Sequence, residues 1–139
     1  MTQTDLRMIA VLGLGLSGRA VCTRAQSMGI SFVAHDDRLS ETGATPPDNV
    51  SLTAPKDWPW EQLDGLVISP GIPHHHPAPH PLAAQAKAAG IPVMSEIEFA
   101  LQSGLAARFV TITGTNGKST ITALIGHILR EAGCDVAIG

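Results

Sequence analysis

The stretch Met8–Gly18, which reads MIAVLGLGLSG, places a compact apolar run directly before three closely spaced glycines. The run Met8–Leu12 predicts a buried strand. After the glycines, Val21, Ala25 and Met28 recur at helical spacing, which predicts a helix. A strand, a glycine turn and a helix in this order are typical of the first unit of an α/β fold with a parallel sheet.

The three glycines, Gly13, Gly15 and Gly18, are followed by an acid at the end of the next predicted strand, Ile30–Ala34. That acid is Asp36, and together these features form the dinucleotide-binding fingerprint. The glycines allow a tight turn and close backbone approach to a phosphate, and the acid could accept hydrogen bonds from ribose hydroxyls. The residues alone leave three interpretations open: an NAD(P) site, a nucleotide-sugar site, or a tight turn without a ligand.

A second glycine motif, Thr113–Thr120 or TGTNGKST, lies between the apolar run Phe109–Ile112, which predicts a strand, and a helical pattern. This arrangement is typical of a loop that holds a nucleotide triphosphate, with backbone N–H groups and the helix N-terminus facing the phosphates. Lys118 would reach the β- and γ-phosphates, and the Ser119 hydroxyl would bind Mg²⁺. The general pattern expects a glycine where this chain has Ile112. A glycine-rich helix cap, or a non-catalytic nucleotide switch, remains as an alternative.

The rest of the chain alternates between short apolar runs and helical patterns, which predicts a parallel sheet with helices packed over it. The region over residues 39–49 is rich in Ser, Thr, Gly and Pro and predicts a loop. The other expected elements are strands over 50–53, 63–68, 91–94 and 135–138, a helix over 82–89, and a helix that follows the Ser95–Glu98 capping box and ends near Gln102.

Composition excludes several classes of protein. The 139 residues are 44% hydrophobic and 15% charged, with a formal net charge of −3, which fits a globular protein without a basic patch. We therefore expect no nucleic acid partner and no membrane insertion, since no apolar run approaches the length of a membrane helix. Cys22 and Cys134 show no pairing pattern and predict reduced thiols in a cytoplasmic protein.

With both loops in view, the chain resembles the Mur ligases, ATP-dependent amino-acid ligases of peptidoglycan precursor synthesis. The resemblance is closest to the members that add D-glutamate to UDP-N-acetylmuramoyl-L-alanine. It is carried, in order along nearly the whole chain, by Gly13–Gly18, Asp36–Arg38, Ser69–Ile72 and Gly114–Thr120. The family often has Asp-Thr-Arg where this chain has Asp36-Asp37-Arg38, which leaves the role of Asp37 open.

The resemblance implies a Rossmann-like domain over 1–93 that binds the UDP part of the substrate. It implies that 94–139 hold a linker helix and the first β–P-loop–α–β unit of a second, ATP-binding α/β domain. The implied UDP-sugar-binding residues are Gly15, Leu16, Ser17, Asp36, Asp37, Arg38 and Gly71. The implied ATP-binding residues are Gly114, Thr115, Asn116, Gly117, Lys118, Ser119 and Thr120, with Lys118 catalytic and Ser119 as a Mg²⁺ ligand.

In the family, ATP phosphorylates the substrate carboxylate to an acyl phosphate, which the amine of D-glutamate then attacks. The resemblance implies that the remaining Mg²⁺ ligands and the amino-acid-binding domain lie outside this chain. We therefore expect an N-terminal part that is inactive alone, of a full-length protein that is a monomer.

Several other residues invite a functional interpretation that we do not adopt. His74, His75, His76 and His80 lie among prolines, where consecutive side chains diverge, so we expect a solvated loop rather than a zinc site. Trp58 and Trp60 more often anchor a loop than stack on a ligand.

Overall fold

The computed structural model describes residues 5–46, 50–73, 78–104 and 107–139. The chain divides into two compact units, Met1–Leu105 and Ala106–Gly139. Each unit is considered by itself below. Among the described helices, none combines the length and the apolar character that crossing a membrane requires.

The first unit is built on a parallel sheet, as predicted. Its strands, in the spatial order β2-β1-β3-β4, are β1 (Met8–Leu12), β2 (Ser31–His35), β3 (Gly65–Ile68) and β4 (Val93–Ser95). Every pairing is parallel, with Ala10 opposite Val33 on one side and opposite Leu66 on the other. The predicted strand over 50–53 is reduced to a single parallel bridge between Ala34 and Leu52.

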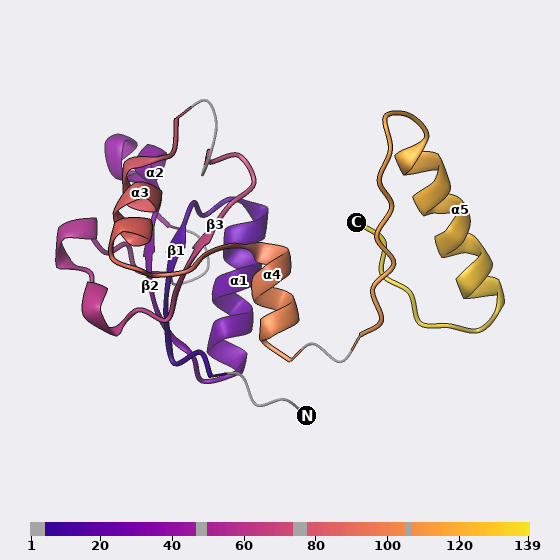
Figure 1. Cartoon of the computed structure of the whole chain (residues 1–139), viewed down its shortest axis with the longest axis horizontal. Coiled ribbons are helices and arrows are strands. Elements are labelled where there is room, and N and C mark those ends of the chain that lie inside the picture. Colours follow the sequence, from indigo (N-terminus) through magenta and orange to yellow (C-terminus); the bar gives the residue numbers. More distant parts are fainter. Residues whose placement is uncertain (1–4, 47–49, 74–77, 105–106) are drawn as a thin grey trace. The chain divides into compact units, whose positions relative to one another are not determined.

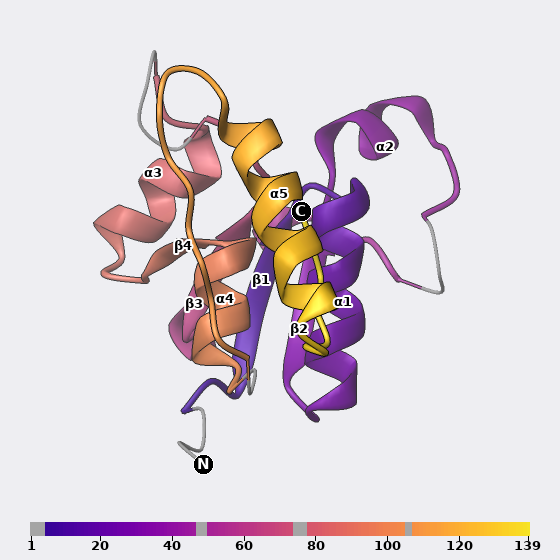
Figure 2. The same ribbon diagram turned by 90° about the vertical axis from the view of Figure 1, so that its right-hand side faces the viewer.

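Helices cover both faces of this sheet, which gives the predicted α/β class. The helices are α1 (Leu16–Ser27), α2 (Asp37–Thr42), α3 (Pro81–Ala88) and α4 (Glu96–Gln102), with short 3₁₀ turns at Pro55–Asp57 and Trp60–Gln62. In Figures 1 and 2, α1 and α4 lie side by side on one face.

Successive side chains of β1 point to opposite faces of the sheet and so divide the core into two clusters. Ile9 and Val11 pack with α1, α4 and Phe99 on one face. Ala10 and Leu12 pack on the other face with Ala83 and Ala86 of α3 and with Trp58. Burial on both faces explains why the strand is a continuous apolar run.

Local signals set the ends of most elements. The Ser95–Glu98 capping box is formed as predicted, since Glu98 N donates to Ser95 Oγ at 3.2 Å and Ser95 N donates to Glu98 Oε2 at 2.7 Å. Helices α1 and α3 are followed by Gly29 and Gly90, which have positive φ and so adopt a conformation that suits glycine.

The loop predicted over 39–49 is wrong in its first part, where α2 lies. Asp36 precedes this helix and accepts a hydrogen bond from Leu39 N at 3.0 Å, and Gly43 ends it in the left-handed region with φ 65°. A capping acid and a terminal glycine therefore outweigh the loop-like composition between them.

The second unit contains α5 (Lys118–Glu131), preceded by the predicted glycine loop. The strands predicted over 109–112 and 135–138 are not formed in the described residues. Instead, Ile138 lies against Gly126 of α5, and Arg130 Nη2 donates to Val136 O at 3.2 Å. A strand requires a neighbour for its ladder hydrogen bonds, and the described part of this unit supplies none.

Candidate nucleotide-binding sites

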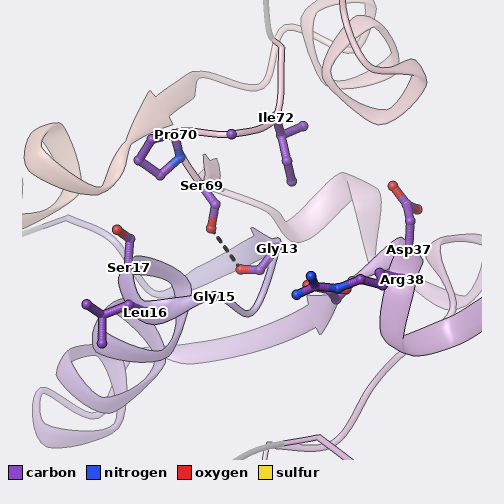
Figure 3. A pocket seen from close by; sticks show the side chains of 11 residues that line it. Gly13, Gly15, Leu16, Ser17, Asp37, Arg38, Ser69, Pro70 and Ile72 are labelled. Carbon is purple, nitrogen blue, oxygen red and sulfur yellow. Dashed lines mark hydrogen bonds between the residues drawn. The ribbon is translucent and has the colours of Figure 1, made fainter. Parts of the chain in front are cut away.

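A pocket of about 460 Å³ lies at the carboxyl ends of β1, β2 and β3 (Figure 3). β2 and β3 flank β1 on opposite sides, so this is the point where the strand order reverses, and such a crevice is the usual ligand site of an open α/β sheet. The pocket is lined by Gly13, Gly15, Leu16, Ser17, Asp36, Asp37, Arg38, Ser69, Pro70, Gly71 and Ile72.

All seven residues predicted to bind a UDP-sugar line this one pocket. They come from three segments, one after each strand. The prediction missed Gly13, Ser69, Pro70 and Ile72 as lining residues, although all four lie in motifs that carry the resemblance.

The glycine turn is packed so tightly that two of its positions exclude side chains. Gly13 has φ 89°, and a Cβ at Gly18 would lie 1.8 Å from the carbonyl oxygen of Gly13. Ser69 Oγ donates a hydrogen bond of 3.0 Å to that same carbonyl (Figure 3). The serine after β3 therefore holds the turn after β1 in place.

The start of α1 forms one wall of the pocket. No side chain among the described residues caps this helix, and its first turn contains no acid. Its first backbone N–H groups are therefore available to an anion, which the helix dipole also favours. Leu16 lines the pocket and is 86% exposed.

Asp36 is buried and both its carboxylate oxygens accept backbone hydrogen bonds. Oδ2 accepts from Leu14 N at 2.8 Å and Oδ1 accepts from Leu39 N at 3.0 Å. Burial acts to raise the pKa of Asp36, but these two hydrogen bonds and the nearby charge of Arg38 outweigh it, so the pKa lies below its ordinary value. Asp36 is therefore ionised at neutral pH, and each oxygen retains a lone pair for a ligand hydroxyl.

Asp37 and Arg38 point in different directions. In Figure 3 the Arg38 side chain extends toward the glycine turn, whereas the Asp37 carboxylate points away from it. Arg38 is the only cationic side chain among the described residues that line the pocket. Asp37 instead bonds two histidines outside the pocket lining, His35 and His80.

The predicted ATP loop ends in a left-handed glycine directly before a helix. Gly117 adopts the left-handed region with φ 76°, and α5 starts at the next residue without a side-chain cap from the described part of the chain. Lys118 Nζ donates to the carbonyl of Gly114, so the lysine lies over its own loop. The residues from Thr113 to Thr120 are exposed. These features fit a triphosphate with Mg²⁺ at Ser119.

The four histidines and two tryptophans that the sequence singles out have different outcomes. Residues 74–76 lie outside the described residues, so the prediction for these histidines stays untested there. His80 is the residue before α3, and its side chain accepts from Leu82 N. Pro81 is the first residue of α3, a position that proline favours because its missing N–H has no intrahelical partner to lose. Trp58 and Trp60 donate to the carbonyls of Thr53 and Pro55 and anchor their loop, as predicted.

No family model matches the chain. Among curated proteins, it is 41% identical to the UDP-N-acetylmuramoylalanine–D-glutamate ligase of Paramagnetospirillum magneticum, over 96% of this chain and 29% of the relative. It is 42% identical to the ligase of that name from Rhodopseudomonas palustris, over 94% of this chain and 29% of the relative. It is 37% identical to the ligase of that name from Nitrobacter winogradskyi, over 100% of this chain and 31% of the relative. The chain thus spans less than a third of these relatives, and the similarity confirms the resemblance stated from the motifs.

Proposed function

We infer that this chain is the nucleotide-binding part of a Mur ligase that joins D-glutamate to UDP-N-acetylmuramoyl-L-alanine and uses ATP to do so. The observation that carries the proposal is the convergence of three distant segments on one pocket. Every residue that the family resemblance assigns to the UDP-sugar lines that pocket. A resemblance of sequence alone does not require that convergence.

In this proposal the pocket takes the uridine diphosphate. The pyrophosphate lies at the start of α1, near the N–H groups of Leu16 and Ser17, and Arg38 supplies the opposing charge. Asp36 accepts hydrogen bonds from the nucleoside. Gly71 allows the ligand to approach its backbone, and a Cβ there would meet nothing within 4 Å, so the space beside it is open.

The second loop takes ATP. Residues Gly114 to Thr120 surround the phosphates, Ser119 holds Mg²⁺, and Lys118 leaves the carbonyl of Gly114 to reach the phosphoryl group that is transferred. Bound ATP with Mg²⁺ supplies the activating phosphoryl group for the substrate carboxylate, and Lys118 stabilises the charge that builds during the transfer. Amide formation with D-glutamate requires groups beyond these residues, so we propose that this chain binds nucleotides but does not complete the reaction.

Calorimetric titration of the chain with uridine diphosphate, UDP-N-acetylmuramoyl-L-alanine and NAD⁺ tests the proposal. We expect both uridine nucleotides to bind. Arg38→Gln should lower their affinity by about tenfold or more, which corresponds to the net free energy of a charged hydrogen bond. Arg108→Gln, at an exposed arginine of the second unit, is the matched control and should leave their affinity unchanged. Binding of NAD⁺ without either uridine nucleotide would overturn the proposal in favour of a dinucleotide-binding domain.

A further inference from the structure

We propose that His80 is a positioning residue of the nucleotide pocket, which acts through Asp37 to hold the Asp36–Arg38 wall against the Ser69–Ile72 wall. This proposal rests on the proposed function in one respect, that the pocket binds uridine diphosphate. It assigns Asp37 a role that does not involve contact with the ligand. We call the hydrogen-bonded group of His35, Asp37 and His80 the clasp.

The Asp37 carboxylate bonds one imidazole through each oxygen. Oδ2 lies 2.8 Å from His80 Nε2, and Oδ1 lies 3.1 Å from His35 Nε2. The histidine side chains are 18% and 12% exposed, against 51% for Asp37. The two rings are therefore largely fixed by packing, and they hold a carboxylate that lies at the surface.

The second ring nitrogen of His80 determines where its proton lies. Nδ1 accepts a hydrogen bond of 3.2 Å from Leu82 N at the start of α3, so it carries a lone pair rather than a proton. The proton is then on Nε2 and is donated to Asp37. His80 thus makes two separable contacts, a helix cap through one nitrogen and the clasp through the other.

The backbone of His80 connects the clasp to the opposite wall of the pocket. His80 N donates to Pro73 O at 2.8 Å, and Ile72 N donates to Ser69 O at 3.0 Å. Pro73 directly follows the Ser69–Ile72 wall in the chain. Hydrogen bonds from Asp37 to His80 and from His80 to Pro73, together with the covalent link from Pro73 to Ile72, therefore connect the start of α2 to the Ser69–Ile72 wall.

Helix α2 needs such a restraint because it is short and poorly packed. It spans Asp37–Thr42 and contains no buried residue. Isolated helices of this length are unstable in water. Without the clasp, α2 would be held mainly by the Asp36 cap and by Leu39, which packs partly against the core. Disorder at the start of α2 would displace Asp36 and Arg38, which line the pocket.

Two conservative substitutions separate the contacts of His80. In His80→Asn, the amide oxygen can replace Nδ1 and keep the α3 cap, while the contact with Asp37 is lost. In His80→Gln, the amide nitrogen can replace Nε2 and keep the contact with Asp37, while the cap is lost. His127→Asn, at an exposed histidine of α5, controls for the loss of an imidazole.

The experiment measures two quantities on the 139-residue chain, the affinity for uridine diphosphate and the amide exchange rates of Leu39 and Ser40 in α2. We expect His80→Asn to lower the affinity for uridine diphosphate about three- to tenfold, which corresponds to the net free energy of about one hydrogen bond. It should also speed amide exchange in α2. Asp37→Ala should do the same, the double variant should be no weaker than either single one, and His80→Gln should retain near wild-type values.

The outcomes distinguish the clasp from the proposed function. Unchanged exchange in α2 for His80→Asn would overturn the clasp whatever the ligand. If Asp37→Ala lowered the affinity for uridine diphosphate while His80→Asn did not, Asp37 would contact the ligand directly and the clasp would again be overturned. If the wild-type chain bound no uridine diphosphate while His80→Asn still sped exchange, the proposed function would fail and the clasp would stand.

Discussion

At the residue scale, the glycine turn shows how steric limits shape the pocket. A side chain at Gly18 would overlap the Gly13 carbonyl oxygen, which also accepts from Ser69 Oγ. The third glycine of the motif is therefore required for close packing of α1 against the turn after β1. Gly15, in contrast, has open space around it and an ordinary φ of −67°, so neither packing nor backbone conformation requires glycine there.

The two glycines should therefore respond differently to substitution by alanine. Gly18→Ala places a Cβ 1.8 Å from a backbone oxygen, so the turn must shift, and we expect a loss of about 1–3 kcal/mol or more in the free energy of unfolding. Gly15→Ala meets nothing within 4 Å and should change that free energy little. Urea unfolding of the two variants and the wild type measures the difference, and equal losses would contradict the packing argument.

At the scale of elements, Asp36 joins two of them. One carboxylate oxygen accepts from Leu14 in the turn after β1, and the other accepts from Leu39 in the first turn of α2. A single acid therefore fixes both the glycine turn and a helix that has no buried residue of its own. This explains why α2 forms in a segment whose composition favours a loop.

Because the pKa of Asp36 lies below its ordinary value of 3.8, its ionised form stabilises the folded state. That stabilisation is fully present above the ordinary pKa and is lost as the pH falls below it. We expect Asp36→Asn to lower the free energy of unfolding at pH 7 and the difference from wild type to shrink below about pH 4. Urea unfolding at both pH values measures this, with Asp57→Asn as an exposed control. A difference that grows on acidification would show that the sign is wrong.

At the scale of the whole molecule, the chain carries two glycine-rich loops of different type, one in each of its two units. The first unit contains both core clusters and every residue that lines the pocket after β1, β2 and β3. The second carries the loop with Lys118, on a helix whose apolar residues Ile121, Leu124 and Ile128 are exposed. The proposed function thus divides its two ligands between units with separate residues.

In the full-length ligase that we propose, substitutions at the two sites should affect different ligands. We expect Lys118→Ala to lower the ligation rate by about 10²-fold or more, since it removes a charge that stabilises phosphoryl transfer, while the affinity for UDP-N-acetylmuramoyl-L-alanine stays nearly unchanged. Asp36→Ala should mainly lower the affinity for the UDP-sugar. Steady-state rates and calorimetric affinities for both variants check this, and equal effects of both substitutions on both ligands would contradict the division.

The sequence alone was sufficient for the features that depend on neighbouring residues. The apolar runs of β1 and β3, the Ser95–Glu98 capping box and the first glycine motif are local, so these strands, the start of α4 and the glycine turn could be predicted. Seven of the eleven residues that line the pocket came from the family resemblance instead. The Asp36 cap of α2 is local too, and it was missed because composition received more weight than the capping acid.

Only the tertiary structure decided the features that depend on distant partners. The strands expected over 109–112 and 135–138 failed because a strand is defined by its neighbour, which no apolar run specifies. The contact of Asp37 with His80 spans 43 positions in the chain. Hydrogen bonds at such separations depend on how the sheet brings β2 and the segment after β3 to one edge, and periodicity and spacing carry no information about that approach.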